Sequence, residues 1–142
     1  MLNKKLTIKE FYTLSFTWGI IMTLIGLIAA AAVMIITKQK PKRNQYGFYF
    51  EVGKGCSGLS LGFITFINEG CTSVLGHEFG HSVQNCYYGP FMIIINLWSA
   101  LRYWYREAIC IIKRIPYRDL PDYDSIWFEG LATNLGNFYK NN

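Results

Sequence analysis

The sequence predicts an α+β protein in which an N-terminal transmembrane helix precedes a small domain made of a β-hairpin and three helices. Three observations lead to this prediction. The chain has 142 residues, enough for one small domain plus a membrane segment. Its first long apolar run carries no charge, and strand-like and helix-like segments follow that run. Charged residues make up only 16% of the chain and hydrophobic residues 51%, a low charge content for a soluble domain.

The apolar run "FYTLSFTWGIIMTLIGLIAAAAVMIIT" covers residues 11–37 and is long enough to cross a bilayer, for which a helix needs about 20 residues. A signal peptide is the alternative, because the start is basic and Ala29–Ala32 offers small residues for cleavage. However, the run is longer than the roughly 7–15 apolar residues of a signal core. We therefore expect an integral protein of the cell membrane that contacts lipid. Its parts are a basic tail at 1–10, the transmembrane helix at 11–37, a basic linker at 38–45 and a domain at 46–142.

The net charge of +5 is concentrated at the two ends of the apolar run. Basic residues at both ends of an apolar span are typical of a membrane protein and argue against nucleic acid as a partner. Slightly more of them follow the run than precede it, which favours a cytoplasmic domain. They are Lys4, Lys5 and Lys9 before the run and Lys38, Lys40, Lys42 and Arg43 after it.

The four cysteines show neither the C-x-x-C spacing of a zinc knuckle nor the pattern of a small disulfide scaffold. They are Cys56, Cys71, Cys86 and Cys110. We expect reduced, buried thiols, which suits a cytosolic or membrane setting.

Beyond the linker, the chain first shows the patterns of two strands and a helix. Residues 46–52 and 59–67 are rich in aromatic and β-branched residues, so we expect them to pair as a hairpin around the glycine-rich "GKGCSG". Residues 70–86 suit a helix. Gly89-Pro90 ends that helix, because proline cannot continue a helix interior.

The next helix is expected at 91–114 and begins like a membrane segment, but Arg102, Arg106 and Glu107 make full immersion costly. We expect it to pack on the domain or to lie at the membrane interface. A second transmembrane span is the alternative. A polar turn and a last helix at 125–139, "SIWFEGLATNLGNFY", complete the chain.

The only two histidines, His77 and His81, lie four residues apart in "TSVLGHEFGHSVQN". On a helix, residues four apart differ by about 40° of rotation and roughly 6 Å of rise, so both imidazoles can bind one ion. Glu78, about 100° further round, is too far off that face to be a ligand but can reach a metal-bound water. In a metal hydrolase the ion lowers the pKa of water and a carboxylate takes its proton. The H-E-x-x-H pattern therefore indicates a zinc site, and Gly76 and Gly80 allow another element to approach it closely.

A catalytic zinc site with two histidines needs a third protein ligand and leaves one position for water. Glu129 is favoured, because at helical spacing it shares a face with small residues that permit close packing on the histidine helix. These residues are Ala132, Thr133 and Gly136. The other downstream candidates are Glu107, Asp119, Asp122 and Asp124. The three aspartates suit a polar turn, and Asp124 also suits the cap of the last helix.

The motif from His77 to His81, followed by "WFEGLAT", resembles the zincin metallopeptidases of the gluzincin type. The chain also resembles a group of small uncharacterised bacterial membrane proteins with the pattern Gly-x-Ser-Leu-Gly, His-Glu-x-x-His-x-x-Gln, Gly-Pro and a Glu-containing helix. The matching residues lie within 46–138 and are Gly58, Ser60, Leu61 and Gly62, then His77 to Gln84, Gly89-Pro90 and Glu129. The resemblance implies zinc bound by His77, His81 and Glu129. It also implies that zinc-activated water hydrolyses a peptide or protein substrate, with Glu78 as the general base.

Other positions are expected to support this site. Thr133 stands where relatives often carry an acidic residue that orients the first histidine, so metal retention is expected to be weaker than usual. Gln84 is a candidate for supporting the metal site. No histidine remains to stabilise an oxyanion, and Tyr117 and Tyr123 are the candidates for that role. By analogy with zincins, the strand at 61–67 would border the cleft, where a peptide adds to it in extended form.

Two other functions fit the same residues. In a site-2-type intramembrane protease, the histidine helix lies in the bilayer and a distant aspartate completes the metal site, but no Asp-Gly follows a late apolar helix here. A non-catalytic membrane interaction or assembly protein would use a metal structurally or not at all, and would not need Glu78. We favour the zinc metallopeptidase. The substrate, including a non-peptide amide, the membrane orientation and the oligomeric state are open at this point.

Overall fold

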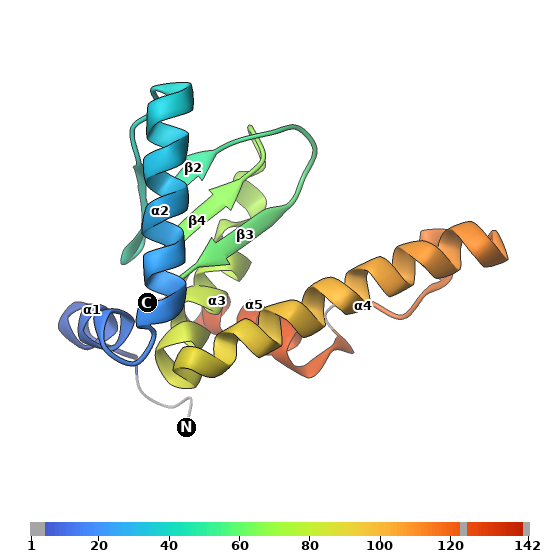
Figure 1. Ribbon diagram of the computed structural model, residues 1–142. Helices are drawn as coiled ribbons and strands as arrows, with labels where there is room; N and C mark the ends of the chain where they lie inside the picture. The colour runs from blue at the N-terminus through green and yellow to red at the C-terminus, as the bar shows by residue number, and fades with distance from the viewer. Residues whose placement is uncertain (1–4, 123–124, 141–142) are drawn as a thin grey trace.

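The computed structural model describes residues 5–122 and 125–140, which form a mixed α+β fold (Figure 1). The helices are α1 (Ile8–Phe16), α2 (Ile20–Thr37), α3 (Leu75–Tyr88), α4 (Met92–Lys113) and α5 (Trp127–Lys140). The strands are β1 (Lys42–Asn44), β2 (Gly47–Glu51), β3 (Gly58–Leu61) and β4 (Ile64–Ile67). The sheet contacts both α2 and α3. The predicted α+β class and the three helices that follow the strands are confirmed, with small shifts in their bounds.

The sheet has the order β1-β2-β4-β3, which differs from the predicted hairpin. β2 and β4 pair in parallel, with Phe48 opposite Ile64, whereas β3 and β4 form an antiparallel hairpin. The segment expected as one strand at 59–67 is therefore two strands. Gly62 lies between them with a φ of +66°, which glycine adopts without steric cost. β1 falls within the segment expected as a linker at 38–45 and pairs antiparallel with β2.

The segment expected as one transmembrane helix at 11–37 is interrupted, and the two helices α1 and α2 replace it. Contacts with α3 stabilise the interruption. Asn85 Nδ2 donates a hydrogen bond to the Gly19 carbonyl oxygen at 3.2 Å, and Trp18 Nε1 donates to the Tyr87 carbonyl oxygen at 3.2 Å. A side chain at Gly19 would overlap the Asn85 amide, so the close approach needs glycine.

α1 packs into the hydrophobic core together with residues of the sheet and of α3. It begins inside the segment expected as a tail at 1–10, behind a capping box formed by Thr7 and Glu10. Phe11 is fully buried and stacks on Phe79 of α3, with ring centroids 5.7 Å apart. The N-terminal helices therefore share one core with the domain that follows them.

α2 is long and apolar enough to cross a membrane. On the side that faces the sheet, Gly26 lets the helix lie against the Leu61 carbonyl group. Only 22% of this 18-residue span is buried, and most of its large apolar side chains are exposed. Among the described residues, Ile20–Thr37 is the single helix with this property, and it is shorter than the span predicted at 11–37.

α3 ends at Tyr88, where Gly89 adopts a φ of +54° and Pro90 follows, as the sequence predicts. α4 starts beside this turn and extends away from the sheet (Figure 1). Of its side chains only Met92 and Arg106 are buried, so α4 contacts the body of the protein along one side only.

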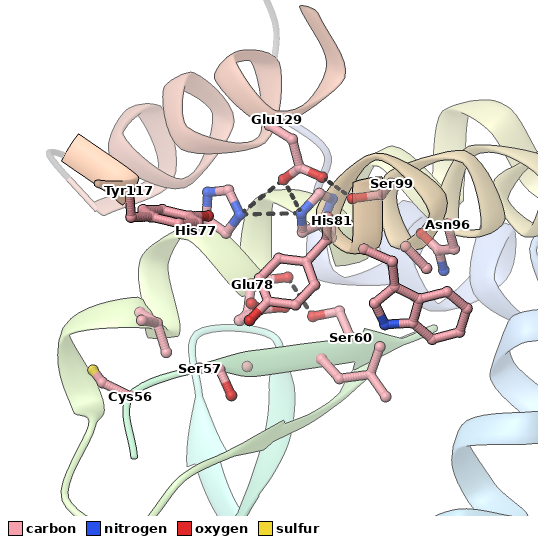
Figure 2. A pocket seen from close by; sticks show the side chains of 16 residues that line it. Cys56, Ser57, Ser60, His77, Glu78, His81, Asn96, Ser99, Tyr117 and Glu129 are labelled. Atoms are coloured by element: carbon pink, nitrogen blue, oxygen red, sulfur yellow. Dashed lines mark hydrogen bonds and ion pairs between the residues drawn. The ribbon is translucent and has the colours of Figure 1, made fainter. Parts of the chain in front are cut away.

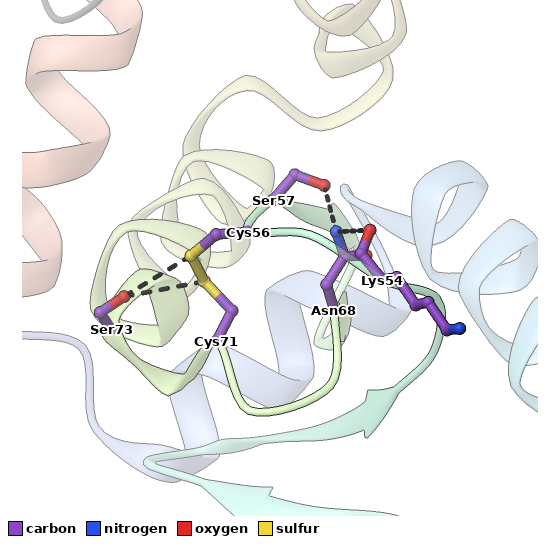
Figure 3. Close-up of a disulfide and its surroundings, with 6 residues drawn as sticks. All are labelled: Lys54, Cys56, Ser57, Asn68, Cys71 and Ser73. Atoms are coloured by element: carbon purple, nitrogen blue, oxygen red, sulfur yellow. Dashed lines mark hydrogen bonds between the residues drawn. A yellow bond between two sulfur atoms is a disulfide. The ribbon is translucent and has the colours of Figure 1, made fainter.

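Cys56 and Cys71 form a disulfide, so the expectation of reduced thiols was wrong for this pair (Figure 3). The bond joins the loop before β3 to the loop before α3, with the two Cα atoms 5.3 Å apart. The two loops meet because β3 pairs with β4, a pairing that the cysteine spacing does not reveal. Cys86 is buried and Cys110 is partly buried, both as free thiols.

Candidate metal centre

α3 and α5 bring three side chains, His77, His81 and Glu129, into a cluster that can hold a metal ion (Figure 2). The two histidine Nε2 atoms lie 3.1 Å apart. Glu129 Oε2 lies 3.2 Å from His77 Nε2 and 3.1 Å from His81 Nε2. Glu129 is only 2% exposed, and the histidines are partly buried. The three ligand atoms thus form a nearly equilateral triangle, made by the residues that the sequence analysis selected.

The two helices approach each other closely because glycines lie at their contact. A side chain at Gly80 would overlap the carbonyl oxygen of Ala132, and one at Gly136 would overlap the carbonyl oxygen of Gly76. Gly76 itself has nothing within 4 Å of the place where its Cβ would lie. The expectation that Gly76 and Gly80 both make room is therefore wrong for Gly76. The pair that permits the approach is Gly80 and Gly136.

The Nδ1 atom of each histidine, the outer ring nitrogen that points away from the cluster, contacts a polar side chain. His77 Nδ1 lies 2.8 Å from Thr133 Oγ1, and His81 Nδ1 lies 2.8 Å from Gln84 Oε1. An amide oxygen can only accept, so His81 Nδ1 carries a hydrogen, and in the neutral imidazole the Nε2 lone pair then faces the cluster. Gln84 is held in turn, because its Nε2 donates to the Phe128 carbonyl oxygen at 2.6 Å. Contacts of this kind orient imidazole ligands around a metal.

The spacing of the cluster fits a four-coordinate metal ion. Ligand atoms about 2.0–2.1 Å from a tetrahedral ion are separated by about 3.3–3.4 Å. The observed separations of 3.1–3.2 Å are close to this value. Two imidazole nitrogens at such a distance repel each other unless a proton or a cation lies between them. Three protein ligands would leave a fourth position of the ion open.

Contacts within the cluster shift the pKa of Glu129 and of His81. Burial by itself would raise the pKa of Glu129, but hydrogen bonds from His77 and His81 hold it well below its usual range. Burial by itself would lower the pKa of His81, but its hydrogen bond to Glu129 and the charge of Glu78 raise it. Glu129 is therefore ionised at neutral pH, as a metal ligand must be.

Glu78 is buried beside the cluster, with 6% of its surface exposed, and lines the same cavity as the histidines. Burial raises the pKa of its carboxyl group, and the charges of His81 and His77 partly offset this rise. Ser60 Oγ on β3 donates to the Glu78 carbonyl oxygen at 2.6 Å. Gly58 makes room for the carboxylate, because a Cβ there would lie 2.6 Å from Glu78 Oε1. A buried carboxyl group with a raised pKa is suited to proton transfer.

A cavity of about 580 Å³ opens over the cluster. Its walls are α3, the start of β3, and the face of α4 that carries Asn96 and Ser99 (Figure 2). β3 is one of the two edge strands of the sheet, whereas β4 lies between β2 and β3. The strand that borders the cavity with a free edge is therefore β3 at 58–61. The expectation of a single bordering strand at 61–67 was wrong, because Gly62 turns the chain within that segment.

The remaining candidates lie in different places. Of the two tyrosines considered for an oxyanion, Tyr117 lines the cavity, whereas Tyr123 lies outside the described residues, as does Asp124. The other carboxylates considered as third ligands stand apart from the cluster, and they are Glu107, Asp119 and Asp122. Within residues 5–122 and 125–140, the carboxylate that reaches both histidines is that of Glu129.

Sequence reasoning missed Ser99, and it named Gly58 only as part of the matching pattern, without its place beside Glu78. Ser99 Oγ on α4 donates a hydrogen bond to Glu129 Oε1, the carboxylate oxygen that is not shared with the histidines (Figure 2). One signal could have revealed it. Asn96 and Ser99 form a polar pair at helical spacing inside the apolar "FMIIINLWSAL", and such a pair marks one face of the helix as facing polar groups.

Comparison of the chain with protein-family models, curated proteins and solved structures gave no match. The function is therefore inferred from the chemistry of the site itself.

Proposed function

We propose that this protein is a membrane-anchored zinc metallopeptidase of the gluzincin type, which hydrolyses peptide bonds in a peptide or protein substrate. One observation carries the proposal: Glu78 is buried in the same cavity as the cluster of His77, His81 and Glu129. A purely structural metal site has no need of an acid–base group beside its ligands. Three ligands, an open position and a neighbouring carboxylate are the parts that metal-assisted hydrolysis requires.

Zinc is the metal that best matches the donor set. Two neutral imidazoles and one carboxylate are common ligands of catalytic zinc, whereas Mg²⁺ and Ca²⁺ prefer oxygen ligands. His77, His81 and Glu129 would hold the ion. The contacts of Thr133 and Gln84 with the outer nitrogens would keep both imidazoles in the ligand orientation. When bound, zinc lowers the pKa of water and polarises a substrate carbonyl group.

Glu78 is proposed to move the proton in the reaction. Its carboxylate accepts a proton from the attacking water as the water oxygen bonds to the substrate carbonyl carbon. It then donates that proton to the leaving amine nitrogen as the C–N bond breaks. Burial raises the pKa of Glu78 toward neutral pH, so the carboxyl group can both accept and donate the proton. Tyr117 lines the same cavity. Among the residues that the structure describes, it is our candidate for donating a hydrogen bond to the developing oxyanion.

The free edge of β3 is the proposed docking site for the substrate backbone. β3 lines the cavity with Gly58, Leu59 and Ser60. An edge strand offers backbone N–H and C=O groups to an incoming chain, and an extended peptide can pair with it. Val74 and Trp104 also line the cavity, so apolar substrate side chains would be favoured beside the scissile bond.

Membrane attachment is proposed from the surfaces of α2 and α4. α4 exposes a row of apolar side chains at helical spacing, each 55–79% exposed: Ile94, Leu97, Trp98, Leu101, Tyr105 and Ile112. Such a row suits a helix lying at the bilayer interface, while α2 is the helix suited to cross the bilayer. The disulfide between Cys56 and Cys71 favours a domain on the non-cytoplasmic side, because disulfides persist in oxidising compartments. This side is opposite to the one that the basic flanks suggest.

The test is zinc content per chain, measured by elemental analysis of the purified full chain, combined with hydrolysis of a peptide library. Wild type and Glu78→Gln should both contain near-stoichiometric zinc, whereas Glu129→Gln should lose it. Glu78→Gln should slow hydrolysis by about 10²- to 10⁴-fold, because it removes the proton acceptor and keeps the metal ligands.

Other results would select other functions. Zinc retained in Glu129→Gln would move the third ligand to an aspartate and favour a site-2-type intramembrane protease. Zinc without hydrolysis of any peptide would favour a non-peptide amide substrate or a structural metal. Wild type that binds no zinc, even after zinc is supplied and the excess removed, would overturn the proposal in favour of a non-catalytic membrane interaction or assembly protein.

A further inference from the structure

We infer that Ser99 on α4 is a positioning residue for the third metal ligand, and that its hydroxyl keeps a single oxygen of Glu129 directed at the metal. The inference rests on the proposed metal site and adds a residue from a third helix to it. The two oxygens of Glu129 have different partners (Figure 2). Oε2 lies 3.1–3.2 Å from both histidine Nε2 atoms, whereas Oε1 accepts the hydrogen bond of Ser99 Oγ.

This division of the two oxygens has a chemical consequence. A carboxylate can bind a metal through one oxygen or through both. A donor on Oε1 occupies a lone pair of that oxygen and disfavours the two-oxygen mode. With a metal bound, Glu129 would then fill one coordination position and would leave another for water. The hydroxyl also gives a partner to an oxygen that is buried, and a buried acceptor without a partner would destabilise the fold.

Serine is suited to this role because it is small and uncharged. It donates to Oε1 without neutralising the negative charge that Glu129 supplies to a metal. A lysine or arginine at the same place would form an ion pair with Glu129 and compete with the metal for the carboxylate. Ser99 is followed by Ala100, which also lines the cavity, so this face of α4 leaves the space above the cluster open.

α4 is fixed on both sides of Ser99, so the hydroxyl has a defined place. Met92 at the start of the helix is 2% exposed. Further along, Arg106 is buried and its Nη1 donates to the Pro121 carbonyl oxygen. A ligand is oriented reliably when its supporting group comes from a rigid element that is itself anchored.

The experiment compares Ser99→Ala and Ser99→Thr with Ser57→Ala, a cavity-lining serine whose Oγ contacts Asn68. Affinity for Zn²⁺ and Co²⁺ is measured by competition with a chromogenic chelator, and the visible spectrum of bound Co²⁺ reports the coordination number. Ser99→Ala should bind both metals about 10- to 100-fold more weakly. Its Co²⁺ bands should also lose intensity, because the second Glu129 oxygen binds and the coordination number rises. Ser99→Thr and Ser57→Ala should resemble wild type.

The outcomes separate this inference from the proposed metal site. Wild-type affinity and an unchanged Co²⁺ spectrum in Ser99→Ala would overturn the role of Ser99 and leave the metal site standing. An equal loss of metal affinity in Ser57→Ala would overturn it as well, since any change in the cavity wall would then weaken metal binding. Wild type that binds neither metal would overturn both. Should Ser99→Ala not fold, Ser99→Thr and Ser99→Val have the same shape and differ in the hydroxyl, so equal metal affinities would overturn the inference.

Discussion

The two walls of the metal-site cavity are held together in different ways. The wall that we call the ligand wall consists of α3 and α5, which meet backbone to backbone at glycines and carry the three side chains that can hold a metal ion. The wall that we call the substrate wall, after its proposed role, consists of β3 and α4. β3 has a free edge, and α4 has only two buried side chains. One wall is therefore packed like a core, whereas the other is largely open.

For the proposed hydrolase, the difference separates two requirements of the site. Ligand atoms must be held to within a fraction of an ångström, which close packing of buried backbone provides. A substrate must enter and leave, which an edge strand and an exposed helix allow. Two serine hydroxyls connect the walls: Ser60 on β3 bonds to the Glu78 carbonyl oxygen, and Ser99 on α4 bonds to Glu129. Substitutions in the two walls should therefore have separable effects on metal binding and on catalysis.

The largest effect is expected from Gly80→Ala in the ligand wall. The added methyl group would overlap the carbonyl oxygen of Ala132, and backbone cannot move aside as the tip of a side chain can. α3 and α5 must therefore separate. We expect the free energy of unfolding to fall by about 3 kcal/mol, as at overpacked core sites, and zinc binding to be lost. Urea unfolding followed by circular dichroism, together with zinc titration, measures both.

Gly76→Ala is the matched control, because it lies one turn earlier on the same helix and its new Cβ would meet nothing within 4 Å. Alanine in place of a helical glycine should leave stability unchanged or raise it by up to about 1 kcal/mol. If Gly80→Ala proved as stable as Gly76→Ala and kept zinc, the ligand wall could not be the closely packed half of the site.

The next largest effect is expected from removing the disulfide with Cys56→Ser and Cys71→Ser together. Closing a loop of this length, with a sequence separation of 15 residues, stabilises a fold by about 3 kcal/mol. The bond joins the loop before β3 to the loop before α3. α3 is also held by its close contact with α5, so loss of the bond should loosen the substrate wall first. We expect urea unfolding to show a stability loss of about this size, with zinc affinity reduced far less than in Gly80→Ala. Complete loss of zinc from the double variant would contradict the independence of the two walls.

Much of the ligand wall could be predicted from the sequence because it depends on short-range patterns. Histidines four residues apart on a helix share a face whatever the rest of the chain does. The small residues around Glu129 marked the face of α5 that packs closely on α3. The N-terminal helices could not be predicted in this way. An uncharged apolar run contains no local mark of the interruption at Gly19, which Asn85 stabilises from α3.

The substrate wall depended on contacts that are distant in sequence. The parallel pairing of β2 with β4 leaves no periodic signal, so the two apolar runs appeared to form a simple hairpin. Gly62 inside the second run was a local sign of a turn, but the β-branched residues around it favoured a continuous strand. Cys56 and Cys71 meet only once β3 and β4 have paired. Ser99 lies in a helix whose many apolar residues favoured a role at the membrane interface over one in the site.

The smallest effect on stability and zinc binding is expected from Gly58→Ala in the substrate wall. The new Cβ would lie 2.6 Å from both Oε1 and Cγ of Glu78, which is closer than non-bonded atoms approach. The end of the Glu78 side chain can move aside, so the fold and the zinc affinity should be kept. A displacement of about 1 Å in a reacting group can cost on the order of 100-fold in rate, so kcat should fall by about that factor with KM nearly unchanged.

Steady-state kinetics and zinc titration of Gly58→Ala, beside Ser57→Ala as the neighbouring control, decide what the glycine does. Lost activity with retained zinc would mean that the substrate wall fixes the proton acceptor while the ligand wall fixes the metal. Full activity in Gly58→Ala would argue against Glu78 as the base, because its carboxylate cannot keep its position beside the new methyl group. Loss of zinc would instead mean that displacement of Glu78 also displaces His77 and His81 on the same helix. The two walls would then act as one unit.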